Sequence, residues 1–152
     1  MNLKITEEGK MNAIRAAVRP GENVRAAAYG QLITVKAALV YYMFGALGAL
    51  ISGAKTKNGF TILTDNAVKI VCMNAFDMTK VDDVFEIPFN EFKKVKYKKP
   101  KFGSHIITFK VNKVSYKLTL FKNAGKHIQN QKENVEVFSQ FFDNLKNMQK
   151  AS

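Results

Sequence analysis

The chain has a single cysteine, Cys72, among its 152 residues. One thiol forms neither an intramolecular disulfide nor a thiolate-rich metal site, which fits a reducing compartment. Cys72 lies inside an apolar segment, where a thiol is usually buried and unreactive. The opening residues MNLKITEEGK lack the basic-then-apolar order of a secretory signal, so we expect no export and a cytoplasmic location.

Histidine is nearly as scarce, since His105 and His127 are the only two. Neither has a cysteine or carboxylate at metal-ligand spacing. The neighbouring Asp82 and Asp83 would face opposite sides of a strand, or lie solvated in a loop. The sequence contains no glycine-rich phosphate loop and no nucleophile elbow. We therefore expect a protein that is not an enzyme, with no catalytic residue, no metal site and no cofactor.

Acidic residues are half as numerous as basic ones, 12 against 24, which gives a net charge of +12. Such an excess favours an acidic partner, whether an anionic membrane surface, an acidic protein or nucleic acid. Residues 101–152 carry 9 basic and 3 acidic side chains, half of the surplus. With 47% hydrophobic residues, the chain is long enough for one ordinary core and too short for two, so residues 1–152 are predicted to form one domain.

The N-terminal region predicts a short helix followed by a strand. Thr6 would cap the helix, with two glutamates in the first turn where the helix dipole favours them. Pro20 and Gly21 would end it, and Val24–Tyr29 would form the first strand. The apolar stripe of this helix is expected to consist of Met11, Ile14 and Val18.

The run from Ala37 to Ala54 has no charged residue, and we expect it to be an insert between the first and second strands. As a helix, about 18 residues would just cross the hydrocarbon of a bilayer. However, if Val24–Tyr29 pairs with strands after residue 59, a single crossing would leave it on the wrong side. Three alternatives stay open: packing on its own domain or on another subunit, membrane contact without crossing, and a true span. The candidate association surface in this run is Leu39, Tyr42, Phe44, Leu47, Leu50 and Ile51.

Two hairpins and two further strands are predicted after the insert. Phe60–Met73 would fold at Asp65 and Asn66. Val84–Ile87 would form a short strand before Pro88. The pair Asn112 and Lys113 would join two strands by a primed turn. The inner side of this second hairpin is expected to comprise Ile107, Phe109, Val111, Val114, Tyr116, Leu118 and Leu120.

The segment Glu91–Lys99 alternates like a half-exposed strand, with Val95 and Tyr97 inward and lysines outward. The outward lysines would contact an anionic surface, or else form a solvated side that protects a sheet edge from aggregation. Nucleic acid is disfavoured, because lysine lacks the bidentate fork of arginine and Tyr97 points away from the lysines. The candidate contact residues are Lys94, Lys96, Lys98, Lys110 and Lys117.

A last amphipathic helix is predicted after Asn130, which would form a capping box with Glu133. A helix rich in phenylalanine needs a large apolar partner, and the open end of a curved sheet is the obvious one. Its apolar stripe is Val135, Phe138, Phe141, Phe142, Leu145 and Met148.

Three motifs resemble the bacterial PH-like domains of the pleckstrin-homology superfold. They are PGENV at Pro20–Val24, FTILTDNAVKIV at Phe60–Val71 and EIPFNEFKKV at Glu86–Val95. The resemblance implies an α+β, mainly β, fold: a PH-like barrel of two antiparallel sheets, capped by the C-terminal helix and preceded by a short helix. It also implies a non-catalytic binding or adaptor module that is often homo-oligomeric.

Eukaryotic relatives that bind phosphoinositides use a basic motif across the first two strands. Lys36, Lys55 and Lys57 stand there without a following arginine, so the lipid-binding residues are not carried over. From residues and resemblance together we expect a self-associating cytoplasmic module, with membrane contact left open. The alternatives are a purely structural homo-oligomer and a non-specific nucleic-acid binder that uses the lysine-rich side.

Overall fold

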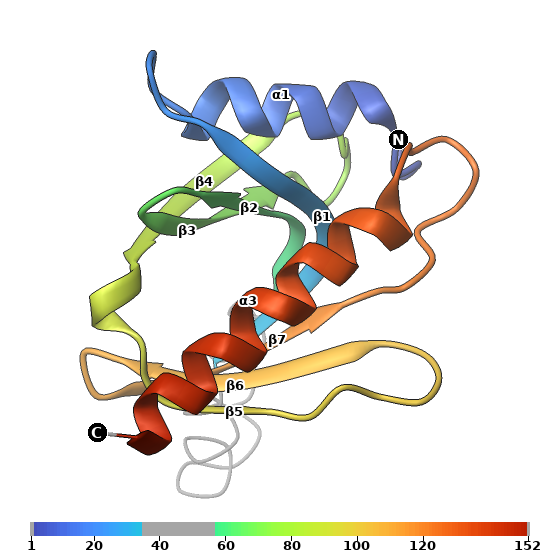
Figure 1. The fold of residues 1–152 in the computed structure, drawn as a ribbon. Coiled ribbons are helices and arrows are strands. Elements are labelled where there is room, and N and C mark those ends of the chain that lie inside the picture. The colour runs from blue at the N-terminus through green and yellow to red at the C-terminus, as the bar shows by residue number, and fades with distance from the viewer. Residues whose placement is uncertain (1, 35–56, 152) are drawn as a thin grey trace, which may run out of the picture.

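The computed structural model describes residues 2–34 and 57–151, which form a seven-stranded antiparallel sheet with two α-helices (Figure 1). The strands follow the order β4-β3-β2-β1-β7-β6-β5. The helices are α1 (Glu7–Ala17) and α3 (Gln131–Ala151), and a 3-10 turn covers Phe89–Glu91. The strands are β1 (Val24–Thr34), β2 (Lys57–Thr64), β3 (Ala67–Met73), β4 (Val81–Pro88), β5 (Lys93–Tyr97), β6 (His105–Val111) and β7 (Val114–Leu120).

Strand β1 joins the two halves of the sheet. Val24 to Leu32 align with β2, and Gly30 to Thr34 align with β7. Where both partners meet β1, Gly30 lies opposite Gly59 of β2. A Cβ atom on Gly30 would stand 2.4 Å from the carbonyl oxygen of Thr119, and one on Gly59 would stand 1.8 Å from that of Val71. Glycine at both positions therefore allows the close backbone approach at this junction.

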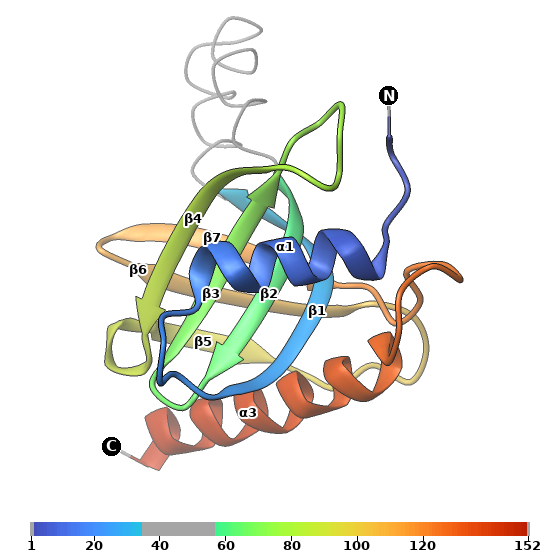
Figure 2. The same cartoon turned by 90° about the horizontal axis from the view of Figure 1, so that it is seen from above.

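The part of the sheet formed by β2 and β3 is buried on both sides, whereas the edge strand β4 is largely exposed. Helix α1 lies across the outer side of β2 and β3 (Figure 2), where Ala13 and Ala17 pack with Phe60, Ile62 and Val71. The inner side packs against α3 and the β5–β7 half. Double coverage explains why β3 is buried at every position and why its sequence is nearly continuous in apolar residues.

Helix α3 packs its phenylalanines into the interior of the sheet. Val135, Phe138 and Phe142 are buried in one cluster with residues of both halves of the sheet. Two glutamines near the ends of the helix attach it to strand backbones. The amide of Gln131 donates to the Tyr29 carbonyl at 3.0 Å and accepts from the Tyr29 N–H at 3.0 Å. The amide of Gln149 accepts a hydrogen bond from the Val95 N–H and donates one to the Phe92 carbonyl.

Both predicted hairpins are confirmed. The first turns at Asp65 and Asn66, where Thr64 Oγ1 accepts a hydrogen bond from the Ala67 N–H at 3.2 Å. The second turns at Asn112 and Lys113, whose φ angles of 51° and 69° are those of a primed turn. Of the seven predicted inner residues, Ile107, Phe109, Leu118 and Leu120 are buried, and Val111, Val114 and Tyr116 are half-buried.

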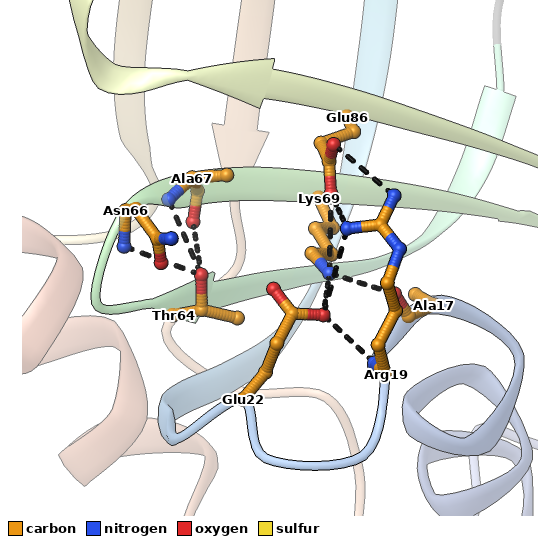
Figure 3. Close-up of polar contacts among 8 residues, drawn as sticks. All are labelled: Ala17, Arg19, Glu22, Thr64, Asn66, Ala67, Lys69 and Glu86. Atoms are coloured by element: carbon orange, nitrogen blue, oxygen red, sulfur yellow. Dashed lines mark hydrogen bonds and ion pairs between the residues drawn. The ribbon is translucent and has the colours of Figure 1, made fainter.

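Lys69, in the middle of β3, is fully buried and ion-paired (Figure 3). Its ammonium group contacts Glu22, lies 3.2 Å from Glu86 and donates to the Ala17 carbonyl at 2.8 Å. Arg19 contacts the same Glu86 carboxylate at 3.1 Å. These contacts, which we call the Lys69 cluster, tie the end of α1 and the following loop to β3 and β4. The GE pair of the PGENV motif thus supplies a carboxylate to the core.

Several local predictions need correction. Helix α1 begins after Thr6 as expected, with Thr6 Oγ1 accepting from the Gly9 N–H, but it buries Ala13 and Ala17 while Met11 is exposed. Alanine is buried there because the helix lies close to the sheet. Met148 is 69% exposed, although the next residue, Gln149, contacts Phe92 and Val95, so Met148 lies on the solvent side of this turn of α3. β1 and β4 are longer than predicted. Asn130 precedes α3 as predicted, with a φ of 59°. Its backbone carbonyl accepts a hydrogen bond from the Asn134 side chain, and the predicted capping box between Asn130 and Glu133 does not form.

The structure has one continuous sheet, and its edge strands β4 and β5 are not paired with each other. A mainly β fold with a C-terminal helix packed on the sheet is therefore established. The two-sheet barrel stays a prediction. The run Ala37–Ala54, with its candidate association residues, lies outside the described residues.

Candidate anion-binding surface

The positive charge of the chain is concentrated in one stretch. Residues 92–132 contain 12 lysines and no aspartate or glutamate, so the rest of the chain has 12 basic and 12 acidic residues and is neutral. This stretch forms β5, β6, β7 and their connections. Sequence reasoning noted the lysines of β5 and missed the complete absence of carboxylates between Glu91 and Glu133, a signal that was available.

The outward side of β5–β7 carries four of the five predicted contact lysines. Strand register aligns Lys96 with Thr108 and Thr108 with Lys117, which places all three on one side of the sheet. Alternation along β6 adds Lys110 to that side, and Lys98 is exposed immediately after the last residue of β5. The opposite side carries buried residues such as Val95 and Phe109. We call the outward set Lys96, Lys98, Lys110 and Lys117 the lysine face.

Lys94, the fifth predicted residue, lies in a bulge. Its φ is 50°, and the register between β5 and β6 shifts between Lys93 and Lys96. Lys94 is exposed, but the bulge interrupts the alternation on which its outward placement was predicted. We therefore leave it out of the lysine face.

The lysine face has no internal charge compensation. Lys96 and Lys117 lie two strands apart, so their backbones are separated by about 10 Å, and Lys96 and Lys98 by about 7 Å. These spacings are close to the screening length of about 8 Å at physiological ionic strength, so the lysines repel one another. None of the four forms an ion pair among the described residues. Binding an anionic surface would relieve this repulsion.

Protection of a sheet edge accounts for only part of this surface. Lysines on the edge strand β5 hinder pairing with another chain. Strands β6 and β7, however, are each paired on both sides, so Lys110 and Lys117 protect no edge. Their positions support a surface that has a partner.

Exposed apolar residues adjoin the lysine face. Phe102, in the β5–β6 loop, is 87% exposed, and it follows Lys98, Lys99 and Lys101 in the sequence. Ile106 is exposed and lies on the outward side of β6. A basic surface with apolar side chains nearby is typical of proteins that lie on a membrane surface.

The strands on either side of the uncharged run in the sequence, β1 and β2, are neighbours in the sheet. Lys57 aligns with Leu32, two residues before Thr34, so both ends of the segment meet the same sheet. Strand β1 thus lies in the sheet between β2 and β7, and the run Ala37–Ala54 itself lies outside the described residues. Among residues 2–34 and 57–151, no helix has the length and hydropathy needed to cross a bilayer.

The Lys69 cluster does not form a reaction site. Lys69 has no exposed surface, so a ligand cannot reach its amine. Asp82 and Asp83 are exposed, and Asp82 accepts from the Asn74 amide. In the described part of the chain, no group of three or more histidine, cysteine or acidic side chains is placed to hold a metal ion.

The two histidines lie in different surroundings. His127 is exposed in the loop before α3. His105 is buried at the start of β6, where its Nδ1 lies 2.7 Å from the hydroxyl of Tyr97. That hydroxyl also contacts Ser139 Oγ of α3 at 2.6 Å. Burial lowers the pKa of His105, which favours the neutral imidazole.

Cys72 is buried as predicted, and we expect it to be unreactive in the folded protein. Desolvation, with a smaller contribution from the charge of Asp83, raises its pKa to about 11. Since the thiolate is the reactive form, a thiol reagent such as dithionitrobenzoate should react about a hundredfold more slowly with the native protein than with the urea-unfolded protein. Equal rates would contradict this prediction.

No protein-family model matches the chain, and no curated protein matches it either.

Proposed function

We propose that this protein is a non-catalytic, PH-like binding module that docks on an anionic lipid surface through the lysine face. The observation that carries the proposal is the placement of Lys110 and Lys117 on fully paired strands, in a stretch without a single carboxylate. The strand order β4-β3-β2-β1-β7-β6-β5 with a C-terminal helix supports the PH-like part.

The energetics favour docking with the lysine face toward the membrane. Each basic side chain near an anionic surface contributes about 1 kcal/mol. Transfer of the exposed Phe102 into the interface would add an apolar contribution of about 1.5–3 kcal/mol if it became fully buried. An electrostatic contact plus an apolar one is the combination that gives stable peripheral binding.

Co-sedimentation with vesicles tests the proposal. The protein should pellet with vesicles of phosphatidylcholine and phosphatidylserine at low salt, and should remain in solution with phosphatidylcholine alone. Raising the salt to about 0.5 M should release it, because screening weakens the contact between exposed charges. Absence of binding to the anionic vesicles at low salt would refute the proposal. If the same salt concentration released the protein from those vesicles and from duplex DNA, the protein would instead be a general polyanion binder.

Self-association remains a separate expectation. It rests on Leu39, Tyr42, Phe44, Leu47, Leu50 and Ile51, which lie outside the described residues. Light scattering of the full chain with and without detergent measures the oligomeric state.

A further inference from the structure

A second positively charged feature lies at one end of the fold, beside the start of β6 and the end of β7. The β5–β6 loop, the connection between β7 and α3, and the start of α3 come together there (Figure 2). They line two adjoining cavities of about 220 Å³ and about 700 Å³, of which the larger is wide open to solvent. Gly103, Lys122 and Lys132 line both cavities, so we treat them as one cleft. A cleft of this size accommodates a small organic ligand.

Lysine dominates the charged groups of the cleft. Lys101, Lys122 and Lys132 are exposed side chains that line the smaller cavity, and none of them forms an ion pair among the described residues. A fourth lysine, Lys99, is already paired with Glu136 at 2.6 Å. That pair has no net charge. The hydrogen bond from Lys99 lowers the pKa of Glu136, so the carboxylate stays ionised and paired with Lys99. Glu133, at the larger cavity, is the other acidic group.

His105 is the buried polar group of the smaller cavity. Its side chain lines the cavity, and the residue is 6% exposed. Nδ1 is hydrogen-bonded to the Tyr97 hydroxyl, and that hydroxyl is also hydrogen-bonded to Ser139 Oγ. Among the described residues, the hydrogen bond of His105 is made at Nδ1, and no buried side-chain nitrogen or oxygen lacks a partner, so the unbonded Nε2 is accessible to solvent. A buried imidazole held at one nitrogen and free at the other is prepared to bond a ligand.

We propose that this cleft binds a small phosphomonoester. Lys101, Lys122 and Lys132 supply the positive charge, acting as point charges on the phosphate oxygens. His105 supplies a hydrogen bond through Nε2, fixed in orientation by the Tyr97–Ser139 contact. The start of α3 adds the positive end of its dipole next to Lys132. The three lysines and the fixed imidazole favour a compact dianion over a diester, which carries one charge. The lysines of this cleft are not those of the lysine face, although Phe102, proposed to enter the membrane interface, also lines the smaller cavity.

Titration calorimetry with inorganic phosphate and with glycerol 3-phosphate tests the site on the full chain. Binding should weaken about tenfold or more in the triple variant K101Q/K122Q/K132Q. The variant K4Q/K80Q/K150Q, which removes three exposed lysines elsewhere, should bind like the wild type. All six positions are exposed, so both variants should fold. Undetectable binding to the wild type, or equal loss in the two triple variants, would overturn the proposal.

The part played by His105 has its own readout. Its imidazole signals in a long-range proton–nitrogen spectrum should shift on addition of inorganic phosphate, and those of His127 should not. The same phosphate concentration should leave the His105 signals unchanged in K101Q/K122Q/K132Q. A His105 signal that never responds would exclude the direct contact.

The phosphomonoester could be a free metabolite or a lipid headgroup, and vesicles separate the two sources. Vesicles with phosphatidic acid expose a monoester, whereas phosphatidylserine vesicles of matched surface charge expose a diester. Preference for phosphatidic acid that is lost in K101Q/K122Q/K132Q assigns the lipid source. Binding of glycerol 3-phosphate without such a preference assigns a soluble ligand. Failure of phosphatidylserine binding would refute only membrane docking, whereas failure of phosphate binding would refute only this cleft.

Discussion

Replacing Glu22 and Glu86 together by glutamine should lower the free energy of unfolding by about 3 kcal/mol, because it leaves the fully buried Lys69 ammonium without a carboxylate. Glutamine preserves size and can still accept a hydrogen bond, so the loss reports the unpaired charge. Urea unfolding followed by circular dichroism measures it. The matched control D65N/E91Q removes two exposed carboxylates outside the cluster and should change stability little.

A third substitution sharpens this test. Lys69→Met in the E22Q/E86Q background replaces the stranded ammonium by an apolar side chain of similar length, and should recover most of the lost stability. Glu22 and Glu86 are partly exposed, so their glutamine replacements can be hydrated without Lys69. If K69M lowers the stability of the E22Q/E86Q protein further, the unpaired buried charge is not the cause of its lost stability.

The Lys69 cluster should make the free energy of unfolding fall at acidic pH. The pKa of Glu22 is lowered mainly by its hydrogen bond with Lys69, and that of Glu86 mainly by Arg19 and then Lys69. Folding thus favours the ionised carboxylates, so their contribution is present above the unfolded pKa of 4.5 and is lost as pH falls through the lower folded values. Between about pH 5 and pH 3, the wild type should lose more stability than E22Q/E86Q. Asp77 and Glu136, whose pKa values are also lowered, remain in both proteins and cancel in the comparison.

Neutralising the lysine face should release the protein from anionic vesicles. K96Q/K98Q/K117Q removes three charges worth about 1 kcal/mol each, so the affinity for phosphatidylserine vesicles should fall about a hundredfold. K4Q/K80Q/K150Q loses the same net charge from positions outside residues 92–132 and should keep most of the affinity. Equal losses would mean that binding follows net charge alone and that no particular surface is used.

The same pair of variants separates the lysine face from the cleft. K96Q/K98Q/K117Q should bind glycerol 3-phosphate like the wild type, since none of the three residues lines the cleft. Reduced phosphate affinity in this variant would show that long-range charge, and not the cleft, attracts the anion.

Local chemistry in the sequence was enough to predict the hairpins. Turn residues such as Asn112 and Lys113 act on their own neighbours, so their effect is visible in the sequence. The inward positions of Val95 and Tyr97 followed from alternation, because that half of the sheet is exposed on one side. Strand β3 is buried on both sides, and its register could not be derived in that way.

Features that depend on distant partners could not be predicted. Lys69 inside AVKIVCM signals a buried ion pair, but Glu22 and Glu86 are 47 and 17 positions away, and only the fold brings them to it. The cleft likewise joins His105 to lysines of two connections and a helix. The stripe predicted for α1 was incomplete: Ile14 and Val18 pack against the core, but the buried Ala13 and Ala17 were missed because alanine carries little hydrophobic signal.

Because β1 is shared between the two halves of the sheet, the order of synthesis and the order of assembly differ. Gly30 of β1 aligns with Leu120 of β7, ninety positions later, and the phenylalanines that fill the interior belong to α3, which follows both. Once β1–β4 have left the ribosome and before α3 has followed, Leu63, Val68 and Ile70 lack the partners that cover them on the inner side. Such nascent chains are prone to aggregate, and contacts so distant in sequence form slowly. The protein should therefore depend on chaperones during translation more than its size suggests.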